Sequence, residues 1–259
     1  MSLLSVRDLA KSFGGVQAVR GVSFDVGARE IVALIGPNGA GKSTCFNMLN
    51  GQLRPDRGAI RLAQPGGGAR ELAGMRPRDI WRLGVGRTFQ IAAAFPSMTV
   101  AENVQMALLS RERRLHGVWR PAREQYRGEA LELLHAVGLA GEEDRPVSVL
   151  AYGQIKSVEL AVALANRPSL LLMDEPTAGM APAERQALMA LTRRLVTERG
   201  TAVLFTEHSM DVVFAHADRV LVLARGELIA EGGVDEVRAD PRVQQAYFGT
   251  GRTVPVEVR

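Results

Sequence analysis

The 259-residue chain is predicted to adopt an α/β fold, because short apolar runs alternate along it with segments of helical periodicity. Ile31–Ile35 is continuously apolar and ends at a glycine-rich loop, which is typical of a strand buried on both faces of a parallel sheet. Leu170–Met173 and Thr201–Phe205 have the same character, and each follows a helical stretch. Parallel strands need such crossovers, so these three runs predict a central parallel sheet.

Further strands are expected on both sides of these runs. Val220–Leu223 is another apolar run, and Ala224–Glu227 predicts a turn into Leu228–Ala230. Ahead of the first central strand, the alternation over Ser5–Val26 predicts a layer of antiparallel strands.

The middle of the chain is predicted to be helical, since no buried-strand run occurs from about residue 99 to residue 166. Thr99 and Glu102 form a capping-box pattern that places a helix start at Val100. Glu129–Val137 is amphipathic and ends at a glycine. We therefore expect residues 1–90 and 160–248 to form the α/β core with its antiparallel layer. Residues 91–159 would form a helical subdomain and residues 249–259 a C-terminal tail.

Composition and charge limit the possible functions. The single cysteine, Cys45, cannot form an intrachain disulfide, which fits a reducing compartment. No run of about 18 apolar residues is present and the N-terminus lacks the apolar stretch of a signal peptide, so a soluble cytoplasmic protein is expected. The formal net charge is +4, but 29 of the 32 basic residues are arginine, a skew also typical of a GC-rich genome. Residues 110–127 hold six arginines and two glutamates, which we interpret as a solvated face.

The segment Gly36–Thr44 fits the pattern G-x-x-x-x-G-K-[ST] directly after the first central strand. Its glycines allow backbone N–H groups to turn toward phosphate oxygens, and the following helix directs its positive end at the same anion. Lys42 would neutralise β- and γ-phosphate charge, and the Ser43 hydroxyl would bind Mg²⁺. The pattern therefore predicts a P-loop that binds a nucleotide together with Mg²⁺. Its candidate ligands are Asn38, Gly39, Ala40, Gly41, Lys42, Ser43 and Thr44.

Two acidic residues follow the second central strand. The carboxyl end of a parallel strand is where ligands bind in an open sheet, and Asp174 and Glu175 lie at that end. Asp174 would hold Mg²⁺ directly or through water, and Glu175 would activate the attacking water.

Three further motifs complete a family pattern. Gln90 follows Gly86–Phe89, Leu150–Gln154 precedes a helix expected over Ile155–Ala165, and His208 follows the third central strand. In this order the motifs resemble those of the ATP-binding subunits of ATP-binding cassette (ABC) transporters, over nearly the whole chain. The resemblance implies a RecA-like P-loop NTPase core with an antiparallel β layer and a helical insert.

The resemblance also assigns roles to residues. Glu175 would be the general base, His208 would position the γ-phosphate, and Gln90 would bind Mg²⁺ and sense the membrane partner. Phe13 would stack on adenine, and Ala18 would also contact the nucleotide. The signature loop Leu150–Gln154 would contribute Ala151, Gly153 and Gln154 to the ATP held by a second subunit in a head-to-tail dimer. Ile91–Met98 would help form the groove that receives a transmembrane permease, which places the chain on the cytoplasmic face of the inner membrane.

Two positions depart from the family pattern. Ala151 stands where the family usually has serine, so no hydroxyl reaches the γ-phosphate from that position. Ala181 stands where aspartate is usual in the D-loop, Ala178–Ala181, which puts communication between the two ATP sites in question.

The form of the motifs narrows the resemblance to branched-chain amino-acid importers and to importers of other small organic solutes. Gly86–Gln90, Leu150–Gln154, Thr177–Pro182 and the ending Ala246–Gly249 all favour this subfamily. Such systems use two different ATPases, two permeases and a periplasmic solute-binding protein.

Two alternatives stay open from the sequence. One is the ATPase of a lipopolysaccharide exporter, against which the Ala-Tyr signature argues mildly. The other is a soluble ABC ATPase that acts on nucleic acid through residues 110–127. The chain has one cassette, no coiled-coil insertion and no zinc-type cysteine set, so nucleic acid is not an expected partner.

Overall fold

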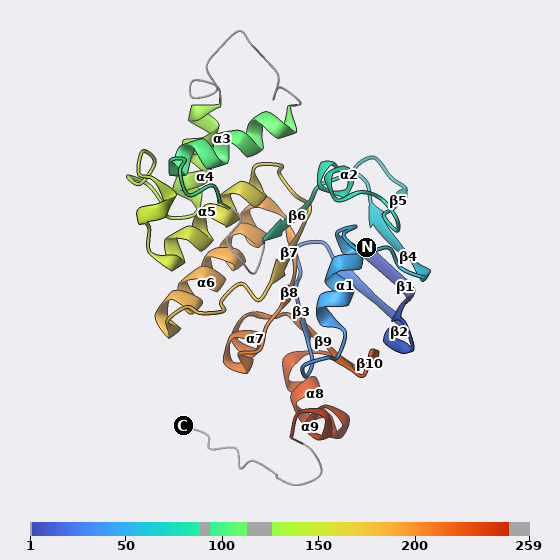
Figure 1. Cartoon of the computed structure of the whole chain (residues 1–259). Coiled ribbons are helices and arrows are strands. Elements are labelled where there is room, and N and C mark those ends of the chain that lie inside the picture. Colours follow the sequence, from blue (N-terminus) through green and yellow to red (C-terminus); the bar gives the residue numbers. More distant parts are fainter. Residues whose placement is uncertain (1, 89–93, 113–125, 249–259) are drawn as a thin grey trace.

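A computed structural model describes residues 2–88, 94–112 and 126–248, and the strands in these ranges form two sheets (Figure 1). The larger sheet has six strands in the order β10-β9-β3-β8-β7-β6. Its strands are β3 (Ile31–Ile35), β6 (Val85–Thr88), β7 (Leu170–Asp174), β8 (Ala202–Thr206), β9 (Arg219–Ala224) and β10 (Glu227–Gly232). All neighbouring pairs are parallel except β10 with β9. This arrangement confirms the predicted α/β core.

The central strands are buried on both faces, as their apolar runs predict. In β3, Ile31, Ala33 and Ile35 point into one hydrophobic cluster. Val32 and Leu34 point into a second cluster on the opposite face. The larger sheet therefore separates two hydrophobic cores.

The smaller sheet is antiparallel, with the strand order β2-β1-β4-β5. Its strands are β1 (Ser2–Phe13), β2 (Val16–Gly27), β4 (Arg57–Ala63) and β5 (Ala69–Glu71). Helix α1 (Lys42–Leu49) lies between the two sheets, and its Phe46 shares a core with Leu4 and Leu34 (Figure 1). The predicted antiparallel layer is confirmed. It also includes β4 and β5, in which at most alternate residues are buried, so no continuous apolar run marks them.

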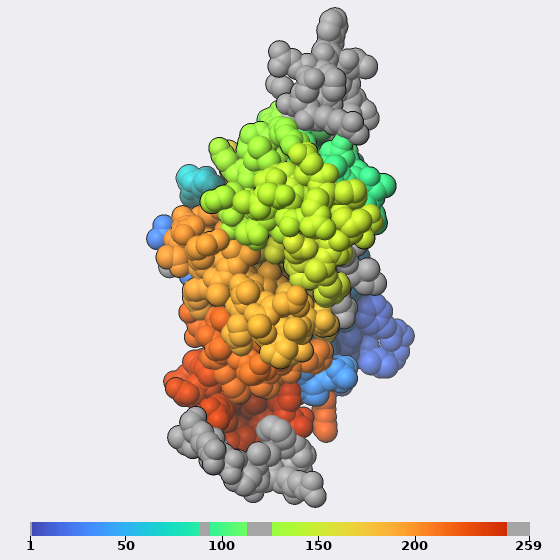
Figure 2. Space-filling view, turned by 90° about the vertical axis from the view of Figure 1, so that its left-hand side faces the viewer, coloured from blue at the N-terminus to red at the C-terminus, as the bar shows by residue number. Residues whose placement is uncertain are grey.

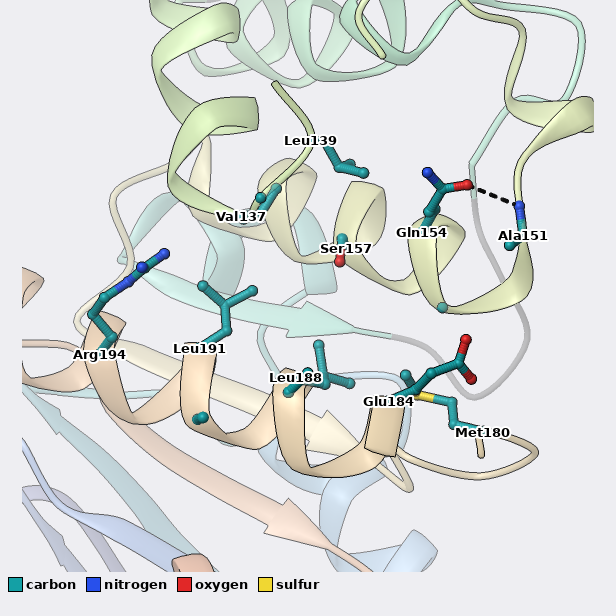
Figure 3. Close-up of a pocket in the computed structure, with 14 residues that line it drawn as sticks. Val137, Leu139, Ala151, Gln154, Ser157, Met180, Glu184, Leu188, Leu191 and Arg194 are labelled. Atoms are coloured by element: carbon teal, nitrogen blue, oxygen red, sulfur yellow. Dashed lines mark hydrogen bonds between the residues drawn. The ribbon is translucent and has the colours of Figure 1, made fainter. Parts of the chain in front are cut away.

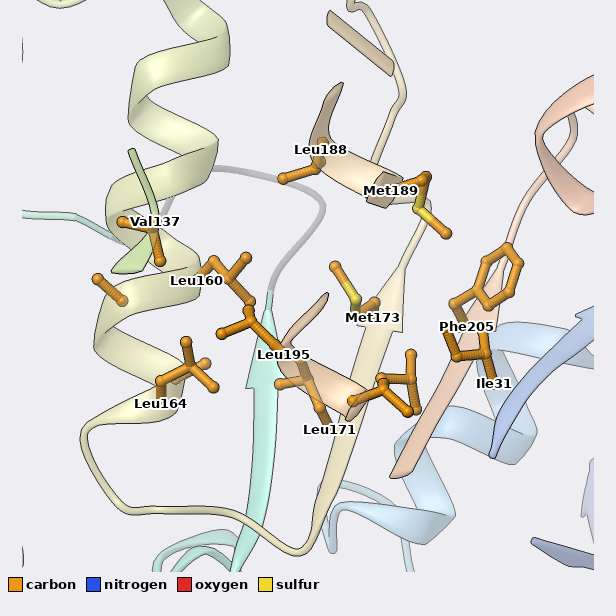
Figure 4. Close-up of a cluster of buried hydrophobic side chains, with 14 of the residues drawn as sticks. Ile31, Val137, Leu160, Leu164, Leu171, Met173, Leu188, Met189, Leu195 and Phe205 are labelled. Carbon is orange, nitrogen blue, oxygen red and sulfur yellow. The ribbon is translucent and has the colours of Figure 1, made fainter. Parts of the chain in front are cut away.

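The other face of the larger sheet is covered by helices. They are α3 (Val100–Arg111), α4 (Arg127–Ala136), α5 (Tyr152–Leu164), α6 (Pro182–Arg199) and α7 (Met210–His216). Figure 4 shows Leu160 of α5 and Leu195 of α6 converging on Leu171 of β7 in one buried cluster. In Figure 2 the green to yellow-green surface of α3–α5 lies above the orange surface of the later helices. The remaining helices are α2 (Pro77–Arg82), α8 (Val234–Ala239) and α9 (Pro241–Phe248).

Local capping explains where two of these helices begin. Thr99 Oγ1 accepts a hydrogen bond from Glu102 N (3.2 Å) and Glu102 Oε2 accepts one from Thr99 N (2.9 Å), which confirms the predicted start of α3. The helix expected from Ile155 instead begins at Tyr152, which corrects the sequence prediction. Ala151 has no side-chain acceptor with which to cap this helix. Gln154 Oε1 instead accepts a hydrogen bond from Ala151 N (3.1 Å), and this contact marks the start of the helix.

Several sequence expectations concern residues outside the described ranges. They are the tail at 249–259, Gln90, most of the arginine-rich segment 110–127 and residues 91–93 of the predicted permease groove. Among the helices in the described part of the chain, none combines the length and the apolar character needed to cross a membrane.

Candidate nucleotide-binding site

The glycine-rich loop lies between β3 and α1, at the carboxyl edge of the larger sheet. Gly39 and Gly41 adopt left-handed backbone conformations, with φ of 79° and 106°. A Cβ at Gly41 would lie 2.5 Å from Ala18 O, so only glycine fits against this strand. The backbone of Ala18 therefore lies directly against the glycine-rich loop, while its predicted contact with a nucleotide stays a prediction.

Lys42 is the first residue of α1, and its side chain reaches back to the start of this loop. Its Nζ donates hydrogen bonds to Gly36 O (2.7 Å) and Pro37 O (3.3 Å), and the residue is 7% exposed. Burial lowers the pKa of the Lys42 ammonium, and the negative charges of Glu175 and Asp174 oppose that shift. The structure thus brings the predicted phosphate-binding lysine to the two predicted acidic residues.

Asp174 is held at the end of β7 by two neighbours. Thr206 Oγ1 donates to Asp174 Oδ1 (2.7 Å), and Arg87 Nη2 donates to Asp174 Oδ2 (3.4 Å). The same guanidinium donates to Gln52 Oε1 at 2.8 Å, which fixes its position. Arg87 lies on β6, a strand that was not predicted because it has four residues and includes a glycine and an arginine. Its contact with Asp174 was therefore missed.

The side-chain oxygens at this edge are suitable ligands for Mg²⁺ that arrives bound to a nucleotide. Ser43 is exposed in the first turn of α1 and offers a hydroxyl oxygen, while Asp174 offers a carboxylate. Mg²⁺ prefers one or two such oxygens together with phosphates and water. Within the described ranges, no group of three or more His, Cys, Asp or Glu side chains could hold a metal ion alone. The site therefore fits Mg²⁺ bound jointly by protein and phosphate.

Glu175 and His208 meet at the ends of neighbouring strands. Glu175 Oε1 lies 2.8 Å from His208 Nε2, with side-chain exposures of 20% and 50%. Glu175 has a φ of 47°, which is uncommon for a residue other than glycine, and its N–H is bonded to Thr206 O (3.2 Å) and Thr206 Oγ1 (3.1 Å). The predicted base and the predicted switch histidine are thus in direct contact.

Glu207, which lies beside His208, has no role predicted from the sequence. Glu207 is 4% exposed, and its Oε1 accepts a hydrogen bond from Thr177 N at 3.0 Å. A buried acid between a strand end and a candidate catalytic histidine is the signal that could have identified it.

The predicted signature residues lie at the start of α5, beside the loop that leads into α6. A Cβ at Gly153 would lie 3.2 Å from Glu184 Oε1 and 3.5 Å from Met180 Cε. Figure 3 shows Ala151 and Gln154 on one side of a cavity of about 650 Å³, with Met180 and Glu184 on the other. Leu188 and Leu191 extend the cavity along α6 as an apolar wall. The signature loop and the loop before α6 are therefore neighbours within one chain.

The signature residues are not brought to the P-loop of the same chain. Helix α1 packs in the cluster on one face of the larger sheet and α5 in the cluster on the other (Figure 1). Phe13 lies at the end of β1, half-exposed, with Lys11 Nζ 5.8 Å from its ring centroid. Phe95, in the described part of the predicted permease groove, is 56% exposed.

Comparison with known families gives two matches. The family described as ABC transporter matches residues 19–178. The family described as branched-chain amino acid ATP-binding cassette transporter matches residues 227–253, at the C-terminal end of the fold.

Similar curated proteins span nearly the whole chain. The high-affinity branched-chain amino acid transport ATP-binding protein LivG of Salmonella typhimurium is 39% identical over 254 residues, covering 95% of this chain and 98% of its own. The corresponding protein BraF of Pseudomonas aeruginosa is 38% identical over 257 residues, with the same coverage.

Solved structures show the same fold. A nucleotide-free ATP-binding cassette from an ABC transporter matches with a TM-score of 0.85 and 31% identity, covering 96% of this chain and 100% of its own. A dimeric ATP-binding cassette bound to ADP and phosphate matches with a TM-score of 0.73 and 25% identity, covering 89% and 98%.

Proposed function

The chain belongs to the ABC transporter family, and from this premise we propose that it is the ATP-hydrolysing subunit of an importer for branched-chain amino acids or related small organic solutes. The observation that carries the proposal is the contact between Glu175 and His208 at the sheet edge that also holds Asp174. A nucleotide whose phosphates lie in the adjacent glycine loop would present its γ-phosphate to this pair.

Each group of residues in the site has its own role in hydrolysis. Lys42 and the loop N–H groups hold the β- and γ-phosphates, and the dipole of α1 supports them. Ser43, Asp174 and Gln90 would hold Mg²⁺, which neutralises charge on the phosphates when bound. Glu175 accepts a proton from water as the water oxygen attacks the γ-phosphorus and the bond to the β-phosphate oxygen breaks. His208 orients the γ-phosphate and fixes the Glu175 carboxylate.

A second ATP-binding subunit completes each site in this proposal. Because the helices that follow the P-loop and the signature loop, α1 and α5, pack on opposite faces of one chain's sheet, a head-to-tail partner supplies Ala151, Gly153 and Gln154 to the nucleotide held at Lys42. Gln154 Oε1 accepts a hydrogen bond from Ala151 N and so holds the first turn of α5 in place. Gln154 would thereby help to point the N-terminus of α5 at the γ-phosphate. Phe13 and Ala18 belong to the adenine side of the site.

The membrane partners follow from the same proposal. Permease subunits would dock against the segment that contains the exposed Phe95, and a periplasmic solute-binding protein would act through them. The chain would then be peripheral on the cytoplasmic face of the inner membrane. Its division into core (1–90 and 160–248), helical subdomain (91–159) and tail (249–259) belongs to this proposal.

The relatives favour this transport function over the alternatives. Curated proteins similar to the chain bear names of branched-chain amino acid transport, and a family model for that class matches residues 227–253. The lipopolysaccharide-export and nucleic-acid functions are not favoured.

The test is purification of the native membrane complex through a tag on this chain. We expect a second ATP-binding subunit and two permeases to co-purify, identified by mass spectrometry. ATP hydrolysis by the complex should rise when a solute-binding protein loaded with leucine, isoleucine or valine is added, and the Glu175→Gln complex serves as the inactive control. Co-purification of nucleic acid, or of exporter subunits in place of importer permeases, would refute the proposal.

A further inference from the structure

Arg185 connects the two loops that follow β7 and β8. We call residues 175–181 the post-β7 loop and residues 207–209 the post-β8 loop. Arg185 Nε donates to Met180 O at 2.8 Å, and its Nη1 donates to Ser209 Oγ at 3.0 Å. Ser209 Oγ in turn donates to Asp211 Oδ1 (2.6 Å), so the hydroxyl is oriented to accept from the arginine. The rigid guanidinium therefore sets the distance between the two loops.

Besides Arg185 and the direct contact between Glu175 and His208, Glu207 also connects the same loops. Its Oε1 accepts hydrogen bonds from the N–H and the hydroxyl of Thr177 in the post-β7 loop. Its Oε2 accepts from His208 N (3.0 Å) and Ser209 N (3.4 Å) in the post-β8 loop. A carboxylate with four donors around it is suited to burial, and Glu207 is 4% exposed.

Packing alone does not hold these loops together. A cavity of about 260 Å³ lies between them, lined by Glu175, Ala178, Arg185, His208 and others. Glu175 is also held in a left-handed backbone conformation, which persists only where surrounding contacts impose it. Hydrogen bonds across the gap therefore carry the restraint.

We propose that Arg185 and Glu207 are positioning residues that make the post-β7 and post-β8 loops move as one unit, so that a displacement of the D-loop backbone at Met180 is transmitted to His208. This rests on the proposed ATPase function. The link through Arg185 would also transmit a D-loop displacement to His208 without using the side chain at position 181, where this chain has alanine. The route runs through the Met180 carbonyl, which every residue type possesses.

Steady-state ATP hydrolysis by the assembled transporter is the first test. We expect Arg185→Leu and Glu207→Gln to lower kcat about tenfold while KM for MgATP stays within about twofold, since neither residue is among the proposed nucleotide ligands. Ser209→Ala should have a smaller effect, and Arg185→Leu with Ser209→Ala should be no slower than Arg185→Leu alone. Arg199→Leu, the same change farther along α6, is the control and should leave kcat unchanged. If Arg185→Leu fails to fold, Arg185→Lys keeps the charge and loses the two-point contact.

Hydrogen exchange of the purified chain is the second test, and it does not depend on hydrolysis. Arg185→Leu should increase amide exchange in residues 177–181 and 207–209 together, with no change in the melting temperature beyond that of Arg199→Leu. An increase in one loop only, or in neither, would overturn the inference. Unchanged kcat in both the Arg185 and the Glu207 variants of an active transporter would also overturn the inference. Equal losses in kcat, ATP affinity and stability would overturn it as well. A wild-type complex without ATPase activity would refute the proposed function instead, and the exchange data would still decide the link between the loops.

Discussion

His208 Nε2 lies 2.8 Å from Glu175 Oε1, although the two residues are 33 positions apart in the chain. The parallel pairing of β7 with β8 places Asp174 opposite Thr206, so the residues that follow both strands emerge at one edge. The register of two neighbouring strands thus brings the proposed base and its proposed orienting partner together.

Replacement of Glu175 by glutamine should separate ATP binding from hydrolysis. The amide keeps the shape of the side chain but cannot accept the proton of the attacking water, so kcat should fall at least about a hundredfold while ATP still binds. A closed dimer should then accumulate with ATP, measured by size-exclusion chromatography beside the ATPase rate. Steady ATPase turnover in this variant would remove Glu175 from the role of base.

Ala151→Ser should strengthen ATP-dependent closure. The new hydroxyl would face the γ-phosphate across the dimer, and a hydrogen bond to a charged group contributes about 1.5–3 kcal/mol. The measurement is ATP-dependent dimerisation and hydrolysis with the partner subunit present.

Ala181→Ser is the matched control for that variant, because Ala181 is also an N-cap residue, with nearly the same backbone angles as Ala151. Both serines should stabilise their helices by about 1 kcal/mol through capping. Only Ala151→Ser should strengthen closure, and equal effects of both variants on dimerisation would contradict the phosphate contact.

Gly41→Ala should destabilise the nucleotide-free chain more than Gly39→Ala. Both glycines have positive φ, which costs other residues about 1–2 kcal/mol. A Cβ at Gly41 would also lie 2.5 Å from Ala18 O, whereas one at Gly39 would have nothing within 4 Å. Denaturant unfolding of both variants gives the comparison, and equal losses of stability would show that the contact with Ala18 relaxes without cost.

Cys45 should be unreactive in the folded chain and should make stability fall at high pH. Burial raises the pKa of its thiol from 9.0 to about 12, so the folded chain keeps this proton where the unfolded chain loses it. Its contribution to stability is complete below pH 9 and is lost as the pH rises toward 12. The unfolding free energy of Cys45→Ala should therefore decline less over this range than that of the wild type. A disulfide reagent that labels native Cys45 at pH 8 as fast as the unfolded chain would contradict the burial.

Local sequence patterns predicted the central strands, the antiparallel layer and several helices, together with the residues of the candidate site. Continuous apolar runs marked β3, β7 and β8, the capping pattern marked the start of α3, and the glycine pattern marked the P-loop. Each of these signals lies within about ten neighbouring residues, where periodicity and turn chemistry act directly. The short strand β6 and the true start of α5 were missed because their formation depends on pairing and on a side-chain cap.

The contacts that hold the candidate site together form only in the folded chain. Arg87 reaches Asp174 across 87 positions, Glu207 reaches Thr177 across 30, and Arg185 reaches Ser209 across 24. Folding also places helices α1 and α5, which follow the P-loop and the signature loop, on opposite faces of the sheet. Such contacts follow from strand order and register, which bring distant residues to one edge, and no local pattern of residue types specifies which polar side chains will meet there.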